Sequence, residues 1–199
     1  MMLHAAISEG MKYMSNGPQY HLHRTVVLVG MMGSGKTAIG RALSAKLAVP
    51  FVDSDAAIEE AAALSIAEIF NRDGEAFFRK RETEVLCRLL AGPPSIVSTG
   101  GGAYLSGENR DAIAQLGVAL WLNADLGTLW ERVRHKDTRP LLRTADPKAT
   151  LTTLLAERTS FYEKAELQVA IDRSASIDDT TGSVIEILLS QSDILEIAT

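Results

Sequence analysis

The sequence has little cysteine and no long hydrophobic run. Cys87 is the single cysteine among 199 residues, so the chain forms no internal disulfide and offers no cysteine-based zinc site. No apolar run reaches the roughly 18 residues that a membrane-spanning helix needs, and residues 1–24 lack the basic segment and apolar stretch of a signal peptide. Such cysteine usage fits a reducing compartment. We therefore expect a cytoplasmic protein with no membrane partner.

The composition is otherwise that of an ordinary globular domain. Hydrophobic residues make up 46% and charged residues 23% of the chain, which excludes collagen-like, low-complexity and mainly disordered classes. The net charge is −5, and residues 172–199 account for it with six acids and one base. Residues 131–148 hold six bases against three acids. This basic segment indicates a local anion site and no nucleic-acid partner, although a solvated surface run is the alternative.

From Thr25 onward, short apolar runs alternate with helical patterns. Strands are predicted at 26–29, 51–52, 96–97, 118–122 and 169–171. Helices are predicted near 35–48, 56–71 (as one piece or two), 74–91, 107–116, 125–134, 149–165 and 178–190. This alternation favours an α/β fold with a five-stranded parallel sheet flanked by helices, which binds ligands at the carboxyl ends of its strands. We expect an N-terminal extension over 1–24 outside the core, a domain over 25–190 and a tail over 191–199.

A phosphate-binding motif follows the first predicted strand. Residues 30–37 read GMMGSGKT, which fits G-x-x-x-x-G-K-[ST] between an apolar strand and an amphipathic helix. Glycines let the loop turn its N–H groups toward phosphate oxygens, and Lys36 can reach the β and γ phosphates. Thr37 supplies a hydroxyl to Mg²⁺. The motif predicts binding of ATP or GTP with magnesium, and the small size of the chain favours a small-molecule kinase.

Two acids follow the second predicted strand. Asp53 and Asp55 are separated by one residue, a spacing that places both side chains on the same side of a strand. Asp53 would hold Mg²⁺, and Asp55 would accept a hydrogen bond or a proton from an attacking hydroxyl. A helix cap at Ser54 or Asp55 is the alternative.

Two arginines and a glycine run indicate an anionic acceptor. Arg79 lies three residues before Glu82, an acid on the apolar stripe of its helix. Arg158 projects from the apolar face of its helix, where a guanidinium needs an anion such as a carboxylate. The glycines at 100–102 follow the third strand and let a ligand contact backbone. A surface ion pair, a snorkelling arginine and an ordinary loop are the respective alternatives.

Together these motifs resemble the shikimate kinase family over about residues 25–190. The segments that carry the resemblance are GMMGSGKT at 30–37, DSD at 53–55, GEAFFRKRE at 74–82, GGG at 100–102, TRPLL at 138–142 and ER at 157–158. The resemblance implies a P-loop nucleoside-monophosphate-kinase-like fold with strand order 2-3-1-4-5, a substrate-binding subdomain at about 54–82 and a lid at about 134–147. It also implies a monomer that phosphorylates the 3-hydroxyl of shikimate with ATP, in chorismate and aromatic amino-acid biosynthesis.

The resemblance further implies a role for each site residue. The catalytic set is Lys36, Asp55 and Arg139, with Arg139 reaching the transferred phosphate from the lid. The set that binds ATP is Gly33, Ser34, Gly35, Lys36, Thr37, Ala38 and Arg132, with Arg132 against the adenine. The set that binds shikimate is Asp55, Arg79, Gly100, Gly101, Gly102 and Arg158, with the two arginines on its carboxylate. Glu82 orients Arg79, Mg²⁺ binds at Thr37 and Asp53, and residues 176–181 close over the base.

Two other functions remain as alternatives. Gluconate kinase resembles the chain in its phosphate loop and acid pair but lacks segments that match Arg79 and the glycines at 100–102. A nucleotide-dependent binding module without turnover is the second. The chemically competent residue at every expected catalytic position argues against it.

Overall fold

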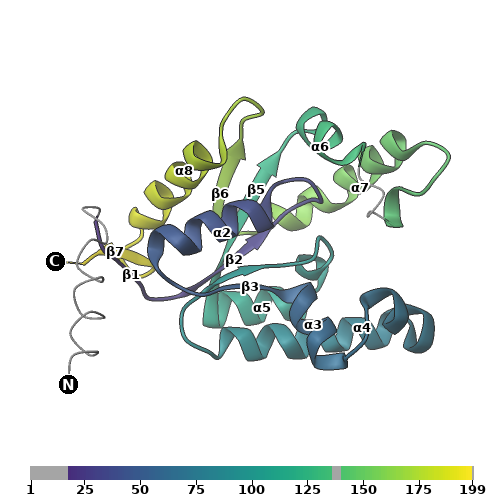
Figure 1. Cartoon of the computed structure of the whole chain (residues 1–199), viewed down its shortest axis with the longest axis horizontal. Coiled ribbons are helices and arrows are strands. Elements are labelled where there is room, and N and C mark those ends of the chain that lie inside the picture. Colours follow the sequence, from purple (N-terminus) through teal and green to yellow (C-terminus); the bar gives the residue numbers. More distant parts are fainter. Residues whose placement is uncertain (1–17, 136–139, 199) are drawn as a thin grey trace, which may run out of the picture.

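Five parallel strands form the central sheet of the computed structural model, which describes residues 18–135 and 140–198. In spatial order the strands are β3 (Phe51–Asp53), β4 (Ile96–Ser98), β2 (Thr25–Val29), β5 (Gly117–Ala124) and β6 (Leu167–Ile171) (Figure 1). Counted along the chain from β2, this is the order 2-3-1-4-5, so the expected fold class is confirmed.

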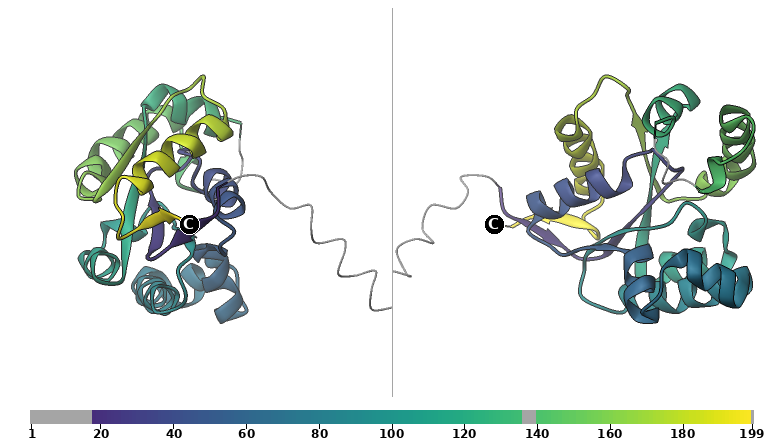
Figure 2. Two further views of the ribbon diagram at one scale, coloured as in Figure 1. Left: turned by 90° about the vertical axis from the view of Figure 1, so that its left-hand side faces the viewer. Right: turned by 45° about the vertical axis from the view of Figure 1, so that its right-hand side comes forward.

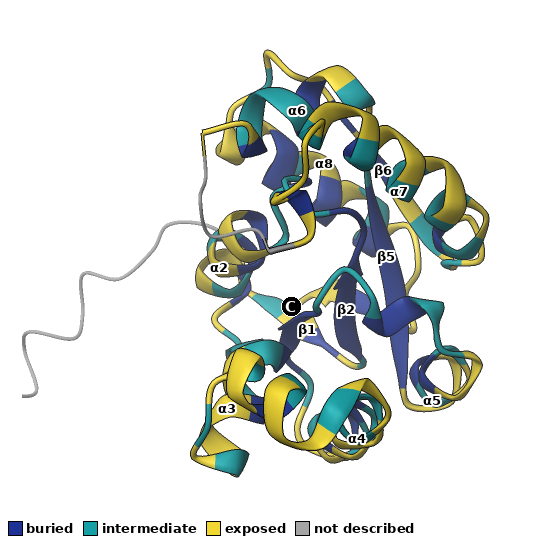
Figure 3. Cartoon of the chain, turned by 90° about the vertical axis from the view of Figure 1, so that its right-hand side faces the viewer, coloured by how far each residue is buried: buried dark blue, intermediate teal, exposed yellow. Residues whose placement is uncertain are grey.

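The register of the sheet brings the functional loops to one edge. Leu28 pairs with Ser98, which in turn pairs with Asp53, so β2, β4 and β3 end at the same level. All five residues of β2 are buried, as expected of a β-branched and apolar strand with neighbours on both sides (Figure 3). The loops that leave these carboxyl ends therefore meet above the sheet.

Helices cover both faces of the sheet. They are α2 (Lys36–Leu47), α3 (Ser54–Ala62), α4 (Ile66–Leu90), α5 (Gly107–Leu116), α6 (Leu126–Val133), α7 (Pro147–Tyr162) and α8 (Ile177–Leu189), with short 3₁₀ turns η1 (Ala103–Leu105) and η2 (Pro140–Leu142). α2 packs beside α8 on one face, and α4 packs beside α5 on the other (Figures 1 and 2). Among the described residues, no helix combines the length and apolar character needed to cross a membrane.

The helices after β3 form a unit with a small apolar core of its own. Ile58 of α3 packs with Ile69, Phe78 and Val85 of α4, apart from the main core under the sheet. The expected helix over 56–71 is in two pieces, one of the two possibilities for it, because α3 ends at Ala62 and a Ser65–Glu68 capping box starts α4. The expected break between 71 and 74 is wrong, since α4 runs on to Leu90. Gly74, at φ 81°, is a non-helical kink inside α4.

A two-stranded sheet near the amino end of β2 corrects the expected domain boundaries at residues 24 and 191 (Figure 1). β1 (Tyr20–Leu22) pairs antiparallel with β7 (Leu195–Ile197), and both Leu22 and Leu195 are buried in the main core. Residues 20–24 therefore belong to the domain, and so do residues 194–197 of the expected tail. Strands of three residues are too short to produce a recognisable alternating pattern. Residues 1–17 lie outside the described residues.

Candidate active site

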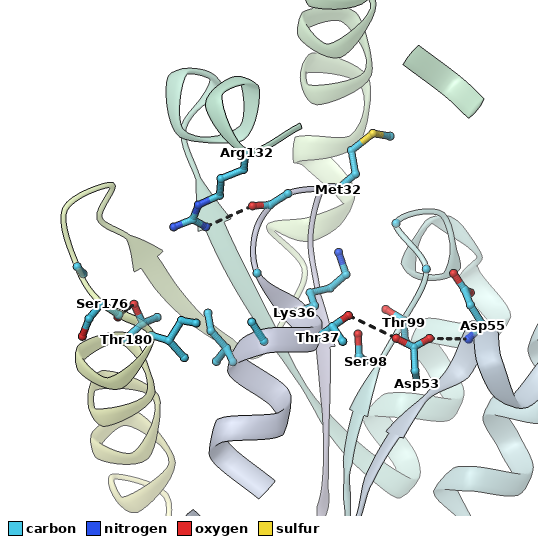
Figure 4. A pocket seen from close by; sticks show the side chains of 18 residues that line it. Met32, Lys36, Thr37, Asp53, Asp55, Ser98, Thr99, Arg132, Ser176 and Thr180 are labelled. Atoms are coloured by element: carbon cyan, nitrogen blue, oxygen red, sulfur yellow. Dashed lines mark hydrogen bonds between the residues drawn. The ribbon is translucent and has the colours of Figure 1, made fainter. Parts of the chain in front are cut away.

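A cavity of about 490 Å³ lies at the carboxyl ends of β2, β3 and β4 (Figure 4). This volume suits a small-molecule ligand. Its lining residues come from the phosphate loop and α2, the acids at and just after the end of β3, the end of β4 and the loop that follows, α6, and the start of α8. They are Met32, Gly33, Gly35, Lys36, Thr37, Ala38, Ile39, Asp53, Asp55, Ser98, Thr99, Gly100, Gly101, Arg132, Ala175, Ser176, Ile177 and Thr180.

The phosphate loop has the backbone that its glycines allow. Gly33 and Gly35 adopt φ values of 86° and 103°, in the left-handed region that favours glycine. Gly35 is also the N-cap of α2, and the first residues of this helix line the cavity. The unpaired N–H groups at the start of the helix therefore face the cavity. Lys36 Nζ donates to the carbonyl oxygens of Gly30 and Met31 at 2.8 and 3.0 Å. The ammonium thus lies along the loop where phosphate oxygens would bind.

The loop is held by a backbone bond of its own Ser34 and by the side chain of Arg132. Ser34 is fully buried and does not line the cavity, and its N–H donates to the Met31 carbonyl at 3.2 Å. Arg132 extends from the last turn of α6, and its Nη1 donates to the carbonyls of Gly33 and Ser34 at 3.3 Å (Figure 4). Across the cavity, Ile177 at the start of α8 is 53% exposed although it is apolar, which leaves a surface for a flat ring.

Asp53 and Thr37 form an oxygen-rich corner of the cavity. Thr37 Oγ1 donates to Asp53 Oδ2 at 3.4 Å, while Asp53 Oδ1 accepts the N–H groups of Asp55 and Ala56 and so caps α3. The helix cap is therefore Asp53, not Ser54 or Asp55. Asp55 belongs to the first turn of α3, so the strand spacing expected for the two acids is wrong, although both line the cavity. A hydroxyl beside a carboxylate suits Mg²⁺, which prefers oxygen ligands.

Asp55 is a buried acid with an unsatisfied oxygen. Its Oδ1 is buried and has no hydrogen-bond partner among the described residues. Burial raises the pKa of Asp55, the nearby Asp53 raises it further, and the positive charge of Lys36 opposes the rise. A carboxyl in this setting accepts a proton more readily than an exposed one. It also needs a donor, which a ligand hydroxyl can provide.

Each of the three glycines after β4 lies beside one polar side chain, and two of them, Gly100 and Gly102, leave space that this side chain occupies. A Cβ built on Gly100 would lie 2.8 Å from Asp55 Oδ1, and one on Gly102 would lie 2.9 Å from both terminal nitrogens of Arg79. A Cβ on Gly101 would lie 3.5 Å from Arg158 Nη1. The loop therefore brings together three predicted acceptor-site side chains from α3, α4 and α7.

Arg79 is held by two acids of its own helix. Its Nη1 donates to Glu82 Oε2 at 2.8 Å, and its Nη2 contacts Glu75 Oε1 at 3.2 Å. The Glu82 side chain is only 2% exposed, so the surface ion pair considered above does not describe it. Burial raises the pKa of Glu82, and the guanidinium of Arg79 opposes that rise. A buried acid fixes the arginine beside Gly102.

Arg158 lies beside a buried tyrosine. The Tyr162 hydroxyl donates to the Gly101 carbonyl at 2.6 Å, and the Tyr162 ring stacks on Trp121. Burial raises the pKa of Tyr162, against the nearby positive charge of Arg158. One helix face thus anchors the glycine loop and presents a partly exposed guanidinium to it.

The structure does not describe one expected site residue, and it adds several that were not expected. Arg139, the expected lid arginine, lies outside the described residues, which omit 136–139. The cavity also includes residues that the sequence analysis did not identify: Met32, Ile39, Ser98, Thr99 and Ala175. Ser98 and Thr99 could have been suggested by their position directly after β4, whereas Met32, Ile39 and Ala175 carry no chemical signal.

Comparisons with known proteins agree on one family. A family model described as shikimate kinase matches residues 32–189. A shikimate kinase from Ruegeria pomeroyi is 59% identical over 89% of this chain and 91% of its own length. The structure of a shikimate kinase from Acinetobacter baumannii in complex with shikimate is 33% identical, with a TM-score of 0.79 over 84% of this chain and 93% of that one.

A gluconokinase from Sinorhizobium meliloti offers a contrast. It is 19% identical, with a TM-score of 0.53 over 86% of this chain and 99% of that one. This likeness shows the fold alone.

Proposed function

The chain belongs to the shikimate kinase family, and we propose that it transfers the γ-phosphoryl group of ATP to the 3-hydroxyl of shikimate. The product is shikimate 3-phosphate, on the route to chorismate and the aromatic amino acids. The observation that carries this proposal is the convergence of Asp55, Arg79 and Arg158 on the glycine loop. An acid that needs a hydroxyl donor lies beside two cations that need an anion, and shikimate offers both groups.

The nucleotide occupies the other side of the cavity in this proposal. The N-terminus of α2 and Lys36 bind the ATP phosphates, with Ser34 contributing its backbone and Ala38 lining the site. The base lies between Arg132 and Ile177. Thr37 and Asp53 would hold Mg²⁺, which neutralises phosphate charge when it is bound.

The acceptor is oriented by charge and by hydrogen bonding. Arg79 and Arg158 bind the carboxylate of shikimate, and the buried Glu82 keeps Arg79 in place. Asp55 accepts the hydrogen of the attacking hydroxyl through Oδ1, and Lys36 stabilises the negative charge on the transferred group. Fixed donors of this kind lower the barrier because they need no reorganisation during transfer.

The domain organisation follows from the same assignment. The substrate-binding subdomain, about 54–82, consists of α3 and α4 up to Glu82, and the separate apolar core of α3 and α4 supports this role. Residues of about 134–147 form the lid, from which Arg139 reaches the phosphoryl group. We infer a cytoplasmic monomer.

An assay of ADP release tests the proposal. Purified enzyme with MgATP should release ADP rapidly with shikimate, and only at background rates with gluconate or with no acceptor. Formation of shikimate 3-phosphate, followed by mass spectrometry, should match ADP release one for one. Equal rates with gluconate would favour the gluconate kinase alternative, and ATP binding without turnover on shikimate would favour the binding module.

A further inference from the structure

Three metal-ligand side chains meet on the solvent face of the two-stranded sheet, away from the active site. His21 and His23 lie on or directly after β1, and Glu196 lies on β7. Their ligand atoms all lie within 4.8 Å of one another. The sheet adjoins the amino end of β2, which begins at Thr25, whereas the phosphate loop leaves the carboxyl end of that strand (Figure 1). The cluster does not line the cavity.

The backbone places these side chains together. His21 is the direct partner of Glu196 in the antiparallel register, and His23 lies two residues further along the same face. The alternate residues Leu22 and Leu195 pair with each other and are buried in the core. A backbone bond from the His23 N–H to the Ile194 carbonyl, at 2.9 Å, holds the strands together beyond the ladder. The backbone positions of the three ligands are therefore held by buried neighbours, while their side chains are exposed.

The distances fit a small tetrahedral ion. Zinc binds imidazole nitrogen and carboxylate oxygen at about 2.0–2.1 Å, so two ligand atoms of a regular tetrahedron lie about 3.3–3.4 Å apart. Glu196 Oε1 lies 3.3 Å from His23 Nε2 and 3.8 Å from His21 Nδ1. The imidazole rings lie 4.5 Å apart between centroids. The ligand atoms of the two histidines lie within 4.8 Å of each other, so the histidine side chains must rotate toward Glu196 and each other for all three to bind one ion.

We propose that His21, His23 and Glu196 form a zinc-binding site, with water completing the coordination, and that the bound ion ties β1 to β7. Two imidazoles and one carboxylate suit zinc and disfavour magnesium, which prefers oxygen ligands alone. The site is thus chemically distinct from the corner formed by Thr37 and Asp53. Because all three ligands are exposed and lie outside the cavity, zinc stabilises the fold and leaves phosphoryl transfer unchanged.

Zinc titration of the full chain, without an added histidine tag and with millimolar Mg²⁺ present, tests the site. Calorimetry should detect one zinc per chain, and His21→Ala, His23→Ala and Glu196→Gln should each weaken binding at least about tenfold, the lower end of the loss from perturbed metal-site partners. His135→Ala is the matched histidine control, and Asp193→Asn is the matched carboxylate control, since Asp193 pairs with Arg24 on the same end of the molecule. Both should bind zinc like the wild type.

Thermal unfolding of the wild type gives a second readout that needs no variant. At free zinc about 100 times its Kd, Tm should rise by about 5–10 °C, and chelator should reverse the rise. Zinc-free wild type and zinc-free Glu196→Gln should have the same kcat in the magnesium assay. Absence of a Tm rise, or zinc affinity unaltered in all three ligand variants, would overturn the proposal. Either result would leave the cluster as an ordinary ion pair on the surface.

Discussion

Gly102→Ala should damage acceptor binding while sparing the fold. The added Cβ would lie 2.9 Å from both terminal nitrogens of Arg79, closer than such atoms approach. A guanidinium is the flexible end of a long side chain, so Arg79 should swing away and the backbone should stay in place. The displaced arginine loses its charge-assisted hydrogen bonds to the shikimate carboxylate, each bond to a charged group contributing about 1.5–3 kcal/mol. Loss of one such bond corresponds to an increase in KM for shikimate of about 10-fold to 150-fold.

Steady-state ADP release at saturating ATP measures this effect. KM for ATP and Tm should stay near the wild-type values, because Gly102 does not line the cavity to which we assign the nucleotide. Gly107→Ala is the matched control, since its Cβ would meet only Arg110 at 3.6 Å, an ordinary contact at the start of α5. If Gly102→Ala left KM for shikimate unchanged, or raised KM for ATP by the same factor, the assignment of Arg79 to the acceptor would be refuted.

Three further predictions test other parts of the site. Lys36→Ala should lower kcat by about 10²–10³, the usual effect of removing one donor from developing negative charge, with Tm unchanged; normal turnover would exclude the phosphate-loop assignment. Asp55→Asn should lower kcat at least about 100-fold. Burial raises the pKa of Asp55, so below about pH 4 the ligand-free wild type should match Asp55→Asn in its free energy of unfolding. As pH rises through that raised pKa, the wild type should become less stable than Asp55→Asn, and urea unfolding measures the difference. Arg158→Lys should lower kcat/KM much more for shikimate than for its methyl ester, since a point charge cannot replace the guanidinium on a carboxylate; equal losses would contradict the pairing.

The sequence was sufficient to predict the parts of the site that a short, local motif encodes. The phosphate loop combines a spacing motif with a flanking strand and helix, and the structure places Lys36 and Thr37 in the cavity as expected. The acid pair was ambiguous, because Asp53, Ser54 and Asp55 can each cap a helix. Which of them does so depends on where β3 ends, and propensity alone does not fix an end point within two residues. The pairing of β1 with β7 is set by contacts between distant parts of the chain.

The glycines at 100–102 show most clearly what a sequence cannot reveal. Positive φ values occur at Gly30, Gly33, Gly35 and Gly74 among the described glycines, but not in the 100–102 run. Backbone conformation therefore does not require glycine in this run. Lack of space requires glycine at Gly100 and Gly102, because Asp55 and Arg79 occupy the volume that a Cβ would fill. The side chains that create this requirement come from other helices, so the run alone reads only as a loop.

This distinction predicts an order of severity among three alanine variants. Gly100→Ala places a Cβ 2.8 Å from Asp55 Oδ1 and should lower kcat, because Asp55 has a short side chain that cannot move aside without leaving the reacting hydroxyl. Gly102→Ala should raise KM for shikimate instead. Gly101→Ala, with its Cβ at 3.5 Å from Arg158, makes an ordinary contact and should be the mildest of the three. A requirement for backbone freedom would harm all three variants alike and would lower Tm, so kinetics and thermal unfolding of the set decide between the two explanations.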